Sequence, residues 1–268
     1  MPAVSLSVCV LLYGDYPQLA SRCLDSISSA EWFPDVRLVI GMNAVSNSTR
    51  ELVYSRYGHH PTATIFDSEE NLRKYPMMRH MLYDPDGAGS SDLVMWFDDD
   101  SYLQSGGRCQ KREWLTDLQG LLQSADMLGY KYTLKWQGVQ KQWVQQQPWY
   151  NPGVSLDTAR ITFITGGWWV AKSSMLAKAD YPWQSLSHNG GDSMLGEMCR
   201  HAGFRQVEYR LGGVAVNACT QGVSGKATRR GISEAVVGKS AADMVSVATT
   251  PQQRGGTVRT ITENGLMQ

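Results

Sequence analysis

The chain has 268 residues, 42% of them apolar, and its 25 basic and 25 acidic side chains leave a formal net charge of zero. This size suits one main α/β domain with appended C-terminal segments, and the apolar content can build a core. The neutral balance excludes a global electrostatic attraction to nucleic acid or to an anionic membrane. The apolar stretch near the N-terminus has no basic flank and is too short for a membrane span, so we expect neither a signal peptide nor a transmembrane segment.

The five cysteines are an odd number, and no two of them show CxxC spacing. This pattern favours neither a zinc site nor a disulfide framework. We therefore expect a reducing, cytoplasmic setting, or the host cytoplasm if the protein is viral.

Apolar runs alternate with helix-periodic segments through the first hundred residues. Strands are expected at 5–12, 36–42, 63–66 and 93–97, and helices at 17–27, 50–57 and from Pro76 to Tyr83. This alternation predicts an α/β fold with a mostly parallel central sheet flanked by helices. Ligands of such sheets bind beyond the carboxyl ends of the strands.

The second half of the chain is less regular. A helix is expected at 114–128, strand and loop in the Gln- and Trp-rich stretch 131–149, and strands at 161–164 and 168–170. A helix is then expected at 192–201, ended by Gly203, followed by a strand-like stretch at 207–216. From Pro251 onward the polar, Gly-containing sequence predicts a mobile tail.

Three aspartates, Asp98, Asp99 and Asp100, follow the apolar run 93–97. In an extended chain Asp98 and Asp100 would point to one side and Asp99 to the other. Two such carboxylates repel each other unless protonation, a basic partner or a cation offsets the repulsion. Oxygen ligands favour Mg²⁺ or Mn²⁺, which complete their shells with water and substrate phosphates. The pattern predicts a metal site for a diphosphate substrate, with an ordinary acidic turn as the alternative.

Several segments together resemble the family-2-like glycosyltransferases of GT-A fold. They are SVCVLLYGDYPQLASRCLDSI, Asn71 with its basic helix, MWFDDDS, TGGWWVAK and GGDSMLGEMCRHAG, and the resemblance covers roughly residues 5–215. It implies one GT-A domain over residues 1–250, followed by the tail 251–268. Within that domain it implies a nucleotide-binding half (1–105) and a smaller, mixed acceptor-side half (106–250).

The resemblance also implies site residues. Nucleotide-sugar contacts are expected at Tyr13, Asp15, Asn43, Asn71, Lys74, Arg79 and Asp98. Asp98 and Asp100 are the expected metal ligands, and Gly166, Gly167, Trp168 and Trp169 the expected acceptor side. The two tryptophans are expected to face opposite ways, so that one of them lines the site. The sequence departs from the family pattern where Gly191 replaces the usual acid, and where the usual glycine after the Asn71 position is missing, with Arg73 near it.

The implied activity is metal-dependent transfer of a sugar from a nucleotide-diphosphate sugar, a UDP-sugar first of all, to an acceptor hydroxyl. Mn²⁺ or Mg²⁺ would neutralise charge on the leaving diphosphate. Asp192 would act as general base in an inverting reaction. Because Asp192 follows two glycines and opens a helix, an N-cap role is its structural alternative.

Basic side chains at Lys226, Arg229 and Arg230 lie in a Gly- and Ser-containing stretch. They suit a loop that closes over a diphosphate, and the alternatives are a solvated surface or contact with an anionic acceptor. His188 and His201 are candidates to complete the metal shell.

The acceptor stays open at this stage. A saccharide or glycoconjugate is the default, and a hydroxymethylated base in viral DNA is the variant. Two other classes compete: a nucleotidyltransferase and a non-catalytic module that binds sugar nucleotides or glycans. Nucleotidyltransferases usually carry a Gly-rich, basic loop after the first strand, which the sequence around Gly14 lacks.

Overall fold

The computed structural model describes residues 4–135, 138–156, 160–186, 190–216, 218 and 257–262. Within them an eight-stranded sheet has the strand order β10-β3-β2-β1-β4-β7-β6-β8. Its strands are β1 (Leu6–Tyr13), β2 (Arg37–Asn43), β3 (Ala63–Ser68), β4 (Leu93–Asp98), β6 (Met127–Lys135), β7 (Arg160–Lys172), β8 (Gln206–Glu208) and β10 (Arg259–Ile261). A second, two-stranded sheet joins β5 (Tyr102–Leu103) to β9 (Val214–Ala215).

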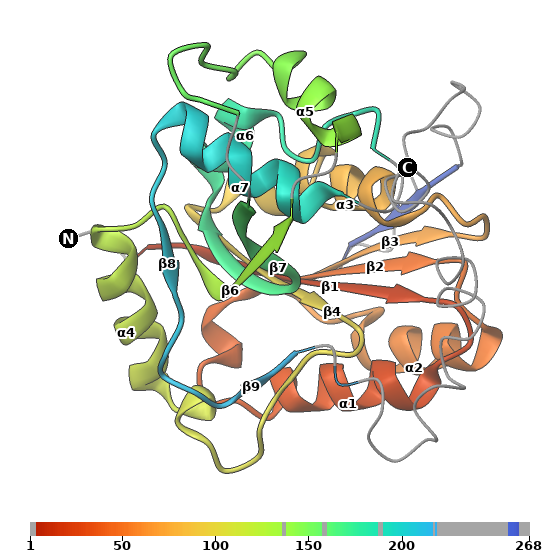
Figure 1. Ribbon diagram of the computed structural model, residues 1–268. Coiled ribbons are helices and arrows are strands. Elements are labelled where there is room, and N and C mark those ends of the chain that lie inside the picture. Colours follow the sequence, from red (N-terminus) through yellow and green to blue (C-terminus); the bar gives the residue numbers. More distant parts are fainter. Residues whose placement is uncertain are drawn as a thin grey trace.

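Helices cover both faces of the large sheet (Figure 1). One face carries α1 (Pro17–Ser28), α2 (Asn47–Tyr57) and α4 (Arg112–Gln123). The other carries α3 (Lys74–Tyr83), α5 (Gly138–Gln145), α6 (Ser173–Ala179) and α7 (Gly191–Ala202). Short 3-10 turns lie at Phe33–Asp35, Ala88–Ser90 and Arg108–Gln110. In this part of the chain, none of the helices is both long and apolar enough to cross a membrane.

Two apolar cores, one on each face of the sheet, explain why β1 and β4 are nearly continuous apolar runs. In β1, Val8 and Val10 pack into the core under α1, whereas Cys9 and Leu11 pack into the core under α3. A strand covered on both faces buries successive side chains on opposite sides, so it lacks a polar alternation. Each fully buried Val or Leu contributes about 1.5–3 kcal/mol of transfer free energy.

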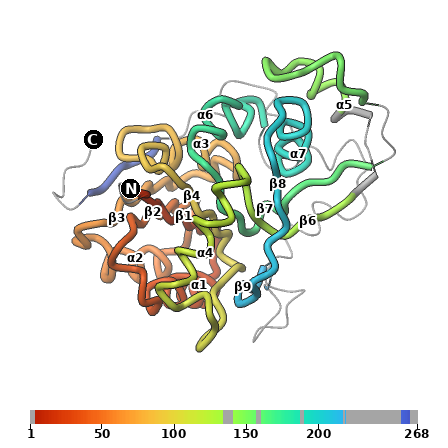
Figure 2. The backbone as a smooth tube through the Cα atoms, turned by 90° about the vertical axis from the view of Figure 1, so that its left-hand side faces the viewer, coloured from red at the N-terminus to blue at the C-terminus, as the bar shows by residue number. Residues whose placement is uncertain are grey.

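The strands β3, β2, β1 and β4 run parallel, as the sequence predicts, and the α/β class with a mostly parallel, helix-flanked sheet is confirmed. β7 is antiparallel to both β4 and β6. Figure 2 shows how the sheet continues from the half that contains β1 to β4 into the half that contains β6, β7 and α7. The carboxyl ends of β1, β2 and β4 therefore face one edge of the molecule.

The second half differs from the sequence-based expectation. The helix expected at 114–128 ends at Gln123, because Met127 and Leu128 are buried as part of β6. Residues 138–145 form α5 instead of strand and loop. The stretch 207–216 divides between β8 and β9, which belong to different sheets.

The two short strands expected around Thr165, Gly166 and Gly167 are one continuous strand, β7. These residues lie beside a shift in the register between β6 and β7, at Gly129 and Lys131, which marks a bulge. Glycine inside a strand is typical of such bulges and of close backbone contacts. The predicted acceptor-side loop is therefore an irregular stretch of strand.

Residues 257–262, which lie within the expected mobile tail, contain the strand β10. Residues of β10 pair antiparallel with β3, with Thr260 opposite Phe66. Val258 and Ile261 pack against the two cores, and Arg259 lies 3.4 Å from a carboxylate oxygen of Glu69. These contacts hold residues 257–262 against the strand β3.

Candidate active site

Three predicted residues stand at the carboxyl ends of neighbouring parallel strands. Tyr13 ends β1 and is the register partner of Asn43, which ends β2. On the other side of β1, Leu11 is the register partner of Asp98, which ends β4. The register therefore brings Tyr13, Asn43 and Asp98 to the same edge of the sheet.

Two asparagines hold the loop between β3 and α3 against this edge. Asn43 accepts a hydrogen bond from Leu72 N (2.8 Å) and donates to Arg73 O (3.3 Å) and Asn71 Oδ1 (3.4 Å). Asn71 accepts from Arg73 N (2.9 Å) and donates to the hydroxyl of Tyr13 (3.2 Å). The side chain of Asn43 is thus used to shape the loop that leads into α3.

The loop places Arg73 in an unusual conformation for a residue with a side chain. Its φ is 73° and its ψ is 170°, a region that glycine occupies almost alone. This is where the family pattern has a glycine near the Asn71 position. The backbone here therefore adopts a conformation that glycine favours, although the residue is arginine.

Lys74, the first residue of α3, lies at the centre of the site. Its ammonium group donates to Asp98 Oδ2 (2.6 Å) and to the carbonyl oxygen of Gly166 (3.1 Å). Burial by itself would lower the pKa of Lys74, but the charges of Asp98 and Asp192 outweigh burial and raise it. Lys74 therefore stays charged and connects the end of β4 to the bulge of β7.

The acidic strand end is arranged differently from the expected extended chain. β4 ends at Asp98, and Asp99 and Asp100 form a turn closed by a hydrogen bond from Ser101 N to Asp98 O (2.9 Å). The alternation that would set Asp98 and Asp100 on one side thus ends with the strand. Asp99 and Asp100 are buried, with 3% and 5% of their surface exposed, and Asp98 is more open.

Neighbouring groups surround these carboxylates. The indole Nε1 of Trp96 donates to Asp98 Oδ1 (2.9 Å). Next to the strand end, the backbone N–H of Ala218 donates to the backbone carbonyl oxygen of Asp100 (2.8 Å). Arg22 donates to the backbone carbonyl oxygen of Ala218 (2.9 Å). Burial, helped by the nearby negative charge of Asp99 and Asp100, raises the pKa of the Cys23 thiol well above its usual range, so it stays neutral.

Asp192 lies across the bulge from Asp98. Its Oδ2 accepts from Gly166 N (2.9 Å), and its Oδ1 accepts from the hydroxyl of Tyr75 (3.0 Å). The N-cap of α7 is Gly190, with φ 89° and no side-chain cap, so the alternative N-cap role of Asp192 is wrong. Asp192 instead lies in the first turn, where the helix dipole favours a negative charge.

Two glycines allow these groups to approach one another. A Cβ added to Gly166 would lie 2.9 Å from Asp192 Oδ1, and a Cβ added to Gly191 would lie 2.2 Å from Cζ of Tyr75. Real Cβ atoms do not approach that closely, because the interior is close-packed. Tyr75 therefore fills the space that a side chain at position 191 would need, so this arrangement requires glycine there.

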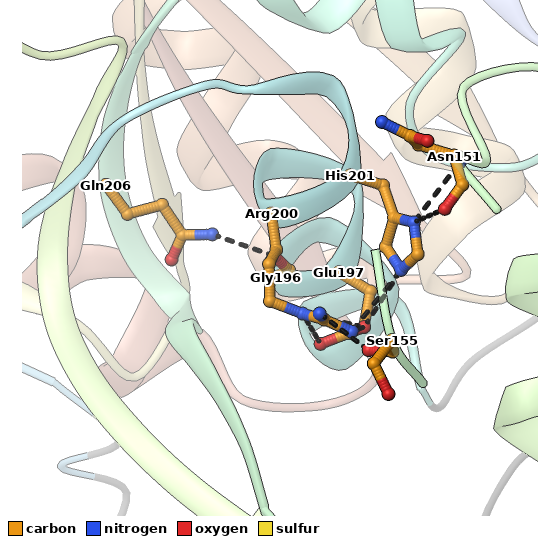
Figure 3. Close-up of polar contacts among 7 residues, drawn as sticks. All are labelled: Asn151, Ser155, Gly196, Glu197, Arg200, His201 and Gln206. Carbon is orange, nitrogen blue, oxygen red and sulfur yellow. Dashed lines mark hydrogen bonds and ion pairs between the residues drawn. The ribbon is translucent and has the colours of Figure 1, made fainter. Parts of the chain in front are cut away.

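A second polar network holds the far end of α7 (Figure 3). Arg200 Nε donates to Glu197 Oε1 (3.1 Å), and Arg200 also donates to Ser155 O (2.8 Å). His201 Nδ1 lies 3.1 Å from Asn151 O, and its Nε2 lies 3.5 Å from Glu197 Oε2. Burial first, and the charge of Arg200 second, lower the pKa of His201. His201 thus serves to pack the loop 149–155 on α7, and its ring nitrogens face Asn151 and Glu197 rather than Asp98 or Asp100.

The predicted acceptor tryptophans are not surface residues. Trp168 and Trp169 are fully buried and face opposite cores, so they do face opposite ways, but neither indole lines a surface. Trp168 packs against Tyr209, with ring centroids 4.7 Å apart, and Trp169 stacks on Trp96 at 5.8 Å. Both belong to the middle of the sheet, where alternate side chains fill the two cores.

Other predicted residues lie apart from this network or outside the described chain. Arg79 donates to Asp180 Oδ1 (2.8 Å) and to Pro182 O (2.7 Å), so its guanidinium is held by the segment after α6 and not by the site. Asp15 is exposed in the loop between β1 and α1. Gly167 lies in β7 next to Gly166. Lys226, Arg229, Arg230 and His188 are outside the described residues.

Tyr75 and Trp96 are site residues that the sequence did not single out. Trp96 is two positions before Asp98 in a strand, and the two-residue repeat of a strand could have placed both on one face. Tyr75 follows Lys74, but its contact joins positions 117 residues apart in the chain. No local pattern signals such a contact.

The site therefore combines carboxylates, one buried ammonium group and a strand end that faces outward. Within the described chain, no group of three or more His, Cys, Asp or Glu side chains could hold an ion by itself. The carboxylates Asp98 and Asp100 could instead supply one or two oxygen ligands to a hard cation whose remaining ligands come from a substrate. Asp192, with both oxygens in place, could accept a proton.

Comparison with known proteins supports the fold. No protein-family model matches the sequence, and no curated protein matches it. The mannosyltransferase PcManGT from Pyrobaculum calidifontis, in complex with GDP-Man and Mn²⁺, matches with a TM-score of 0.51 at 16% identity, over 76% of this chain and 54% of that one. S. aureus TarS 1-349 matches with a TM-score of 0.48 at 15% identity, over 77% of this chain and 58% of that one. This chain thus spans little more than half the length of either protein, and it has the α/β fold of the GT-A glycosyltransferases.

Proposed function

We propose that this chain is a metal-dependent glycosyltransferase that moves a sugar from a nucleotide-diphosphate sugar to an acceptor hydroxyl. The observation that carries the proposal is the hydrogen-bonded network that joins Asp98, Lys74, Gly166 and Asp192 beyond the carboxyl end of the sheet. This is the edge at which α/β folds bind their ligands. The complex of the mannosyltransferase of the same fold with GDP-Man and Mn²⁺ supports the choice of substrate and ion.

The residues present fit a divalent cation. Mg²⁺ and Mn²⁺ are commonly held by one or two carboxylates and completed by water and substrate phosphates, and Asp98 and Asp100 can supply the carboxylates. Asp98 keeps lone pairs for this purpose, because each of its oxygens accepts one described hydrogen bond. When bound, the cation neutralises negative charge that develops on the leaving diphosphate.

Local charge also favours a cation over direct binding of phosphate. The carboxylates Asp98, Asp99, Asp100 and Asp192 lie at this edge, with Lys74 among them. An anionic donor would be repelled by this group of carboxylates without an added positive charge. The nucleotide-sugar contacts predicted for Tyr13, Asp15, Asn43, Asn71 and Lys74 form part of this proposal.

The protein groups would then perform an inverting transfer. The acceptor oxygen forms a bond to the anomeric carbon while the bond from that carbon to the diphosphate oxygen breaks. The acceptor hydroxyl gives its proton to Asp192, whose two oxygens keep free lone pairs beside their hydrogen bonds to Gly166 and Tyr75. Lys74 orients Asp98 and fixes the bulge of β7, so the donor side and the base keep a constant separation.

The acceptor is a saccharide or glycoconjugate in this proposal, and hydroxymethylated DNA is the variant. We place the reaction in the cytoplasm, with residues 1–105 as the donor half and 106–250 as the acceptor half. A DNA acceptor predicts retention on DNA-cellulose that falls steeply with salt, because phosphate contacts release counterions.

A thermal-shift screen with UDP-, GDP- and TDP-sugars, each with and without Mn²⁺, tests the donor class. A ligand that binds only the native protein raises the melting temperature by mass action. We expect one nucleotide class to raise it only when Mn²⁺ is present. If no sugar nucleotide shifts the transition under either condition, the proposal is wrong.

Two variants then test separately the role of Asp100 as a metal ligand and the role of Asp192 as the base. Asp100→Ala should abolish the Mn²⁺-dependent part of nucleotide affinity in calorimetry. Asp192→Asn should keep donor affinity and lose transfer. Asp86→Asn is the matched control, because Asp86 is an exposed carboxylate in the loop before β4, at the opposite end of that strand. Near-normal transfer by Asp192→Asn would show that Asp192 is not the general base.

A further inference from the structure

The segment that opens α3 carries two adjacent side chains that reach opposite sides of the site. Lys74 reaches Asp98, whereas Tyr75 reaches Asp192. Tyr75 is buried, with 2% of its surface exposed, and belongs to the core under α3. Its position is therefore set by packing, and its hydroxyl has little freedom to leave Asp192.

The hydroxyl of Tyr75 uses both of its hydrogen-bonding capacities on α7. It donates to Asp192 Oδ1 (3.0 Å) and accepts from Gly191 N (3.1 Å). One phenol thus fixes both the carboxylate and the backbone that precedes it. Gly191 is part of the same arrangement, because any side chain there would overlap the ring.

We propose that Tyr75 is a positioning residue for Asp192, which it holds through its hydroxyl together with the backbone N–H of Gly191. The inference rests on the proposed function, because Asp192 needs positioning only if it accepts the acceptor proton. The hydroxyl and Gly166 N together hold the two carboxylate oxygens, so the plane of the carboxylate is fixed. A base held in this way presents the same lone pairs in every encounter with the acceptor.

The charges around Asp192 are consistent with this role. The negative charges of Asp192 and Asp98 both act on the titratable groups of Lys74, Tyr75 and Tyr181. Burial first, and the negative charge of Asp192 second, raise the pKa of Tyr75 and of Tyr181 well above the usual range. Tyr75 therefore keeps its hydroxyl proton near neutral pH and can donate it to Asp192.

Tyr75→Phe removes the hydroxyl and keeps the ring that packs in the core. Tyr83→Phe is the matched control, because Tyr83 lies on the same helix and its hydroxyl is within hydrogen-bond distance of two carbonyl oxygens, Leu176 O (3.1 Å) and Tyr181 O (2.5 Å). Among the described residues it has no hydrogen bond to a carboxylate. Turnover is measured as release of nucleotide diphosphate from UDP-N-acetylglucosamine and from GDP-mannose with Mn²⁺, with water as acceptor. The wild-type protein establishes in advance which of the two is a substrate.

For Tyr75→Phe we expect kcat to fall roughly 10- to 100-fold, the size expected for a lost hydrogen bond to a charged group, with little change in donor KM. The acidic limb of the pH profile should move to higher pH, because the carboxylate loses a donor that favours its charged form. In the Asp192→Asn background the same substitution should have no further effect on kcat. Tyr83→Phe should leave kcat and the pH profile unchanged.

Wild-type kcat and an unmoved pH profile in folded Tyr75→Phe would overturn the inference and leave the proposed function intact. Failure of the wild-type protein to bind any sugar nucleotide in the thermal-shift screen would overturn both. A double-mutant cycle of Tyr75→Phe with Asp192→Asn on the free energy of unfolding measures the contact without substrate. Additive effects in that cycle would also contradict the inference.

Discussion

Arg73 is expected to be strained, and replacing it with glycine should stabilise the protein. Its φ of 73° with ψ of 170° is held from both sides, because Asn71 accepts from its N–H and Asn43 donates to its carbonyl. A residue with a Cβ in this region costs about 1–3 kcal/mol. Glycine removes that strain, but in the unfolded chain it has about 0.5–1 kcal/mol more conformational freedom to lose than alanine.

The net gain for Arg73→Gly is therefore about 1 kcal/mol, and Arg73→Ala isolates the cause. Alanine removes the side chain but keeps the Cβ, so it should gain nothing, and it is also a poorer residue than glycine at this N-cap position of α3. The measurement is the free energy of unfolding from urea titration with the m-value monitored. If Arg73→Ala is as stable as Arg73→Gly, the strain argument is wrong.

Three further outcomes test the packing of α7. Gly191→Ala should destabilise the protein by about 1–3 kcal/mol, because its Cβ would overlap the buried Tyr75 ring, and Tyr75→Leu in the same chain should recover part of that loss. Glu197→Gln should cost about 2 kcal/mol in urea titrations, because Arg200 loses its carboxylate partner, whereas a neutral result would show that the pair contributes nothing. Stability should fall as the pH drops below about 6.5, since the pKa of His201 is lowered in the folded state and the unfolded chain binds its proton first. His201→Gln should flatten that part of the pH dependence, and an unchanged slope would contradict the assignment.

The first half of the fold follows from its sequence because the signals there are local. The apolar runs that become β1 and β4 are bounded by polar residues, and parallel strands with intervening helices have one favourable handedness. The same reasoning places Asp98 at the end of a strand and at the ligand-binding edge. What local reasoning could not supply is the turn at Asp99 and Asp100, which depends on β4 ending where the bulge of β7 begins.

The second half is harder to predict because tertiary contacts decide its elements. Trp168 and Trp169 were expected to offer one indole to an acceptor, yet a strand in the middle of the sheet buries both. Residues 138–145 have no strong helical period but form α5 against α7. The contact of Tyr75 with Gly191 depends on volume: neither residue has a chemical signature alone, and only their closeness shows that position 191 needs glycine.

Helix α3 links the two parts of the site through its first two residues. Gly166 receives the ammonium group of Lys74 on its carbonyl and gives its N–H to Asp192, so the bulge of β7 lies between the two carboxylates. Lys74 and Tyr75 are adjacent, and each fixes one of these carboxylates. A shift of the start of α3 would therefore move Asp98 and Asp192 together. Asn43, at the end of β2, holds the loop before α3. The geometry of the proposed base therefore depends on Asn43 through the position of α3.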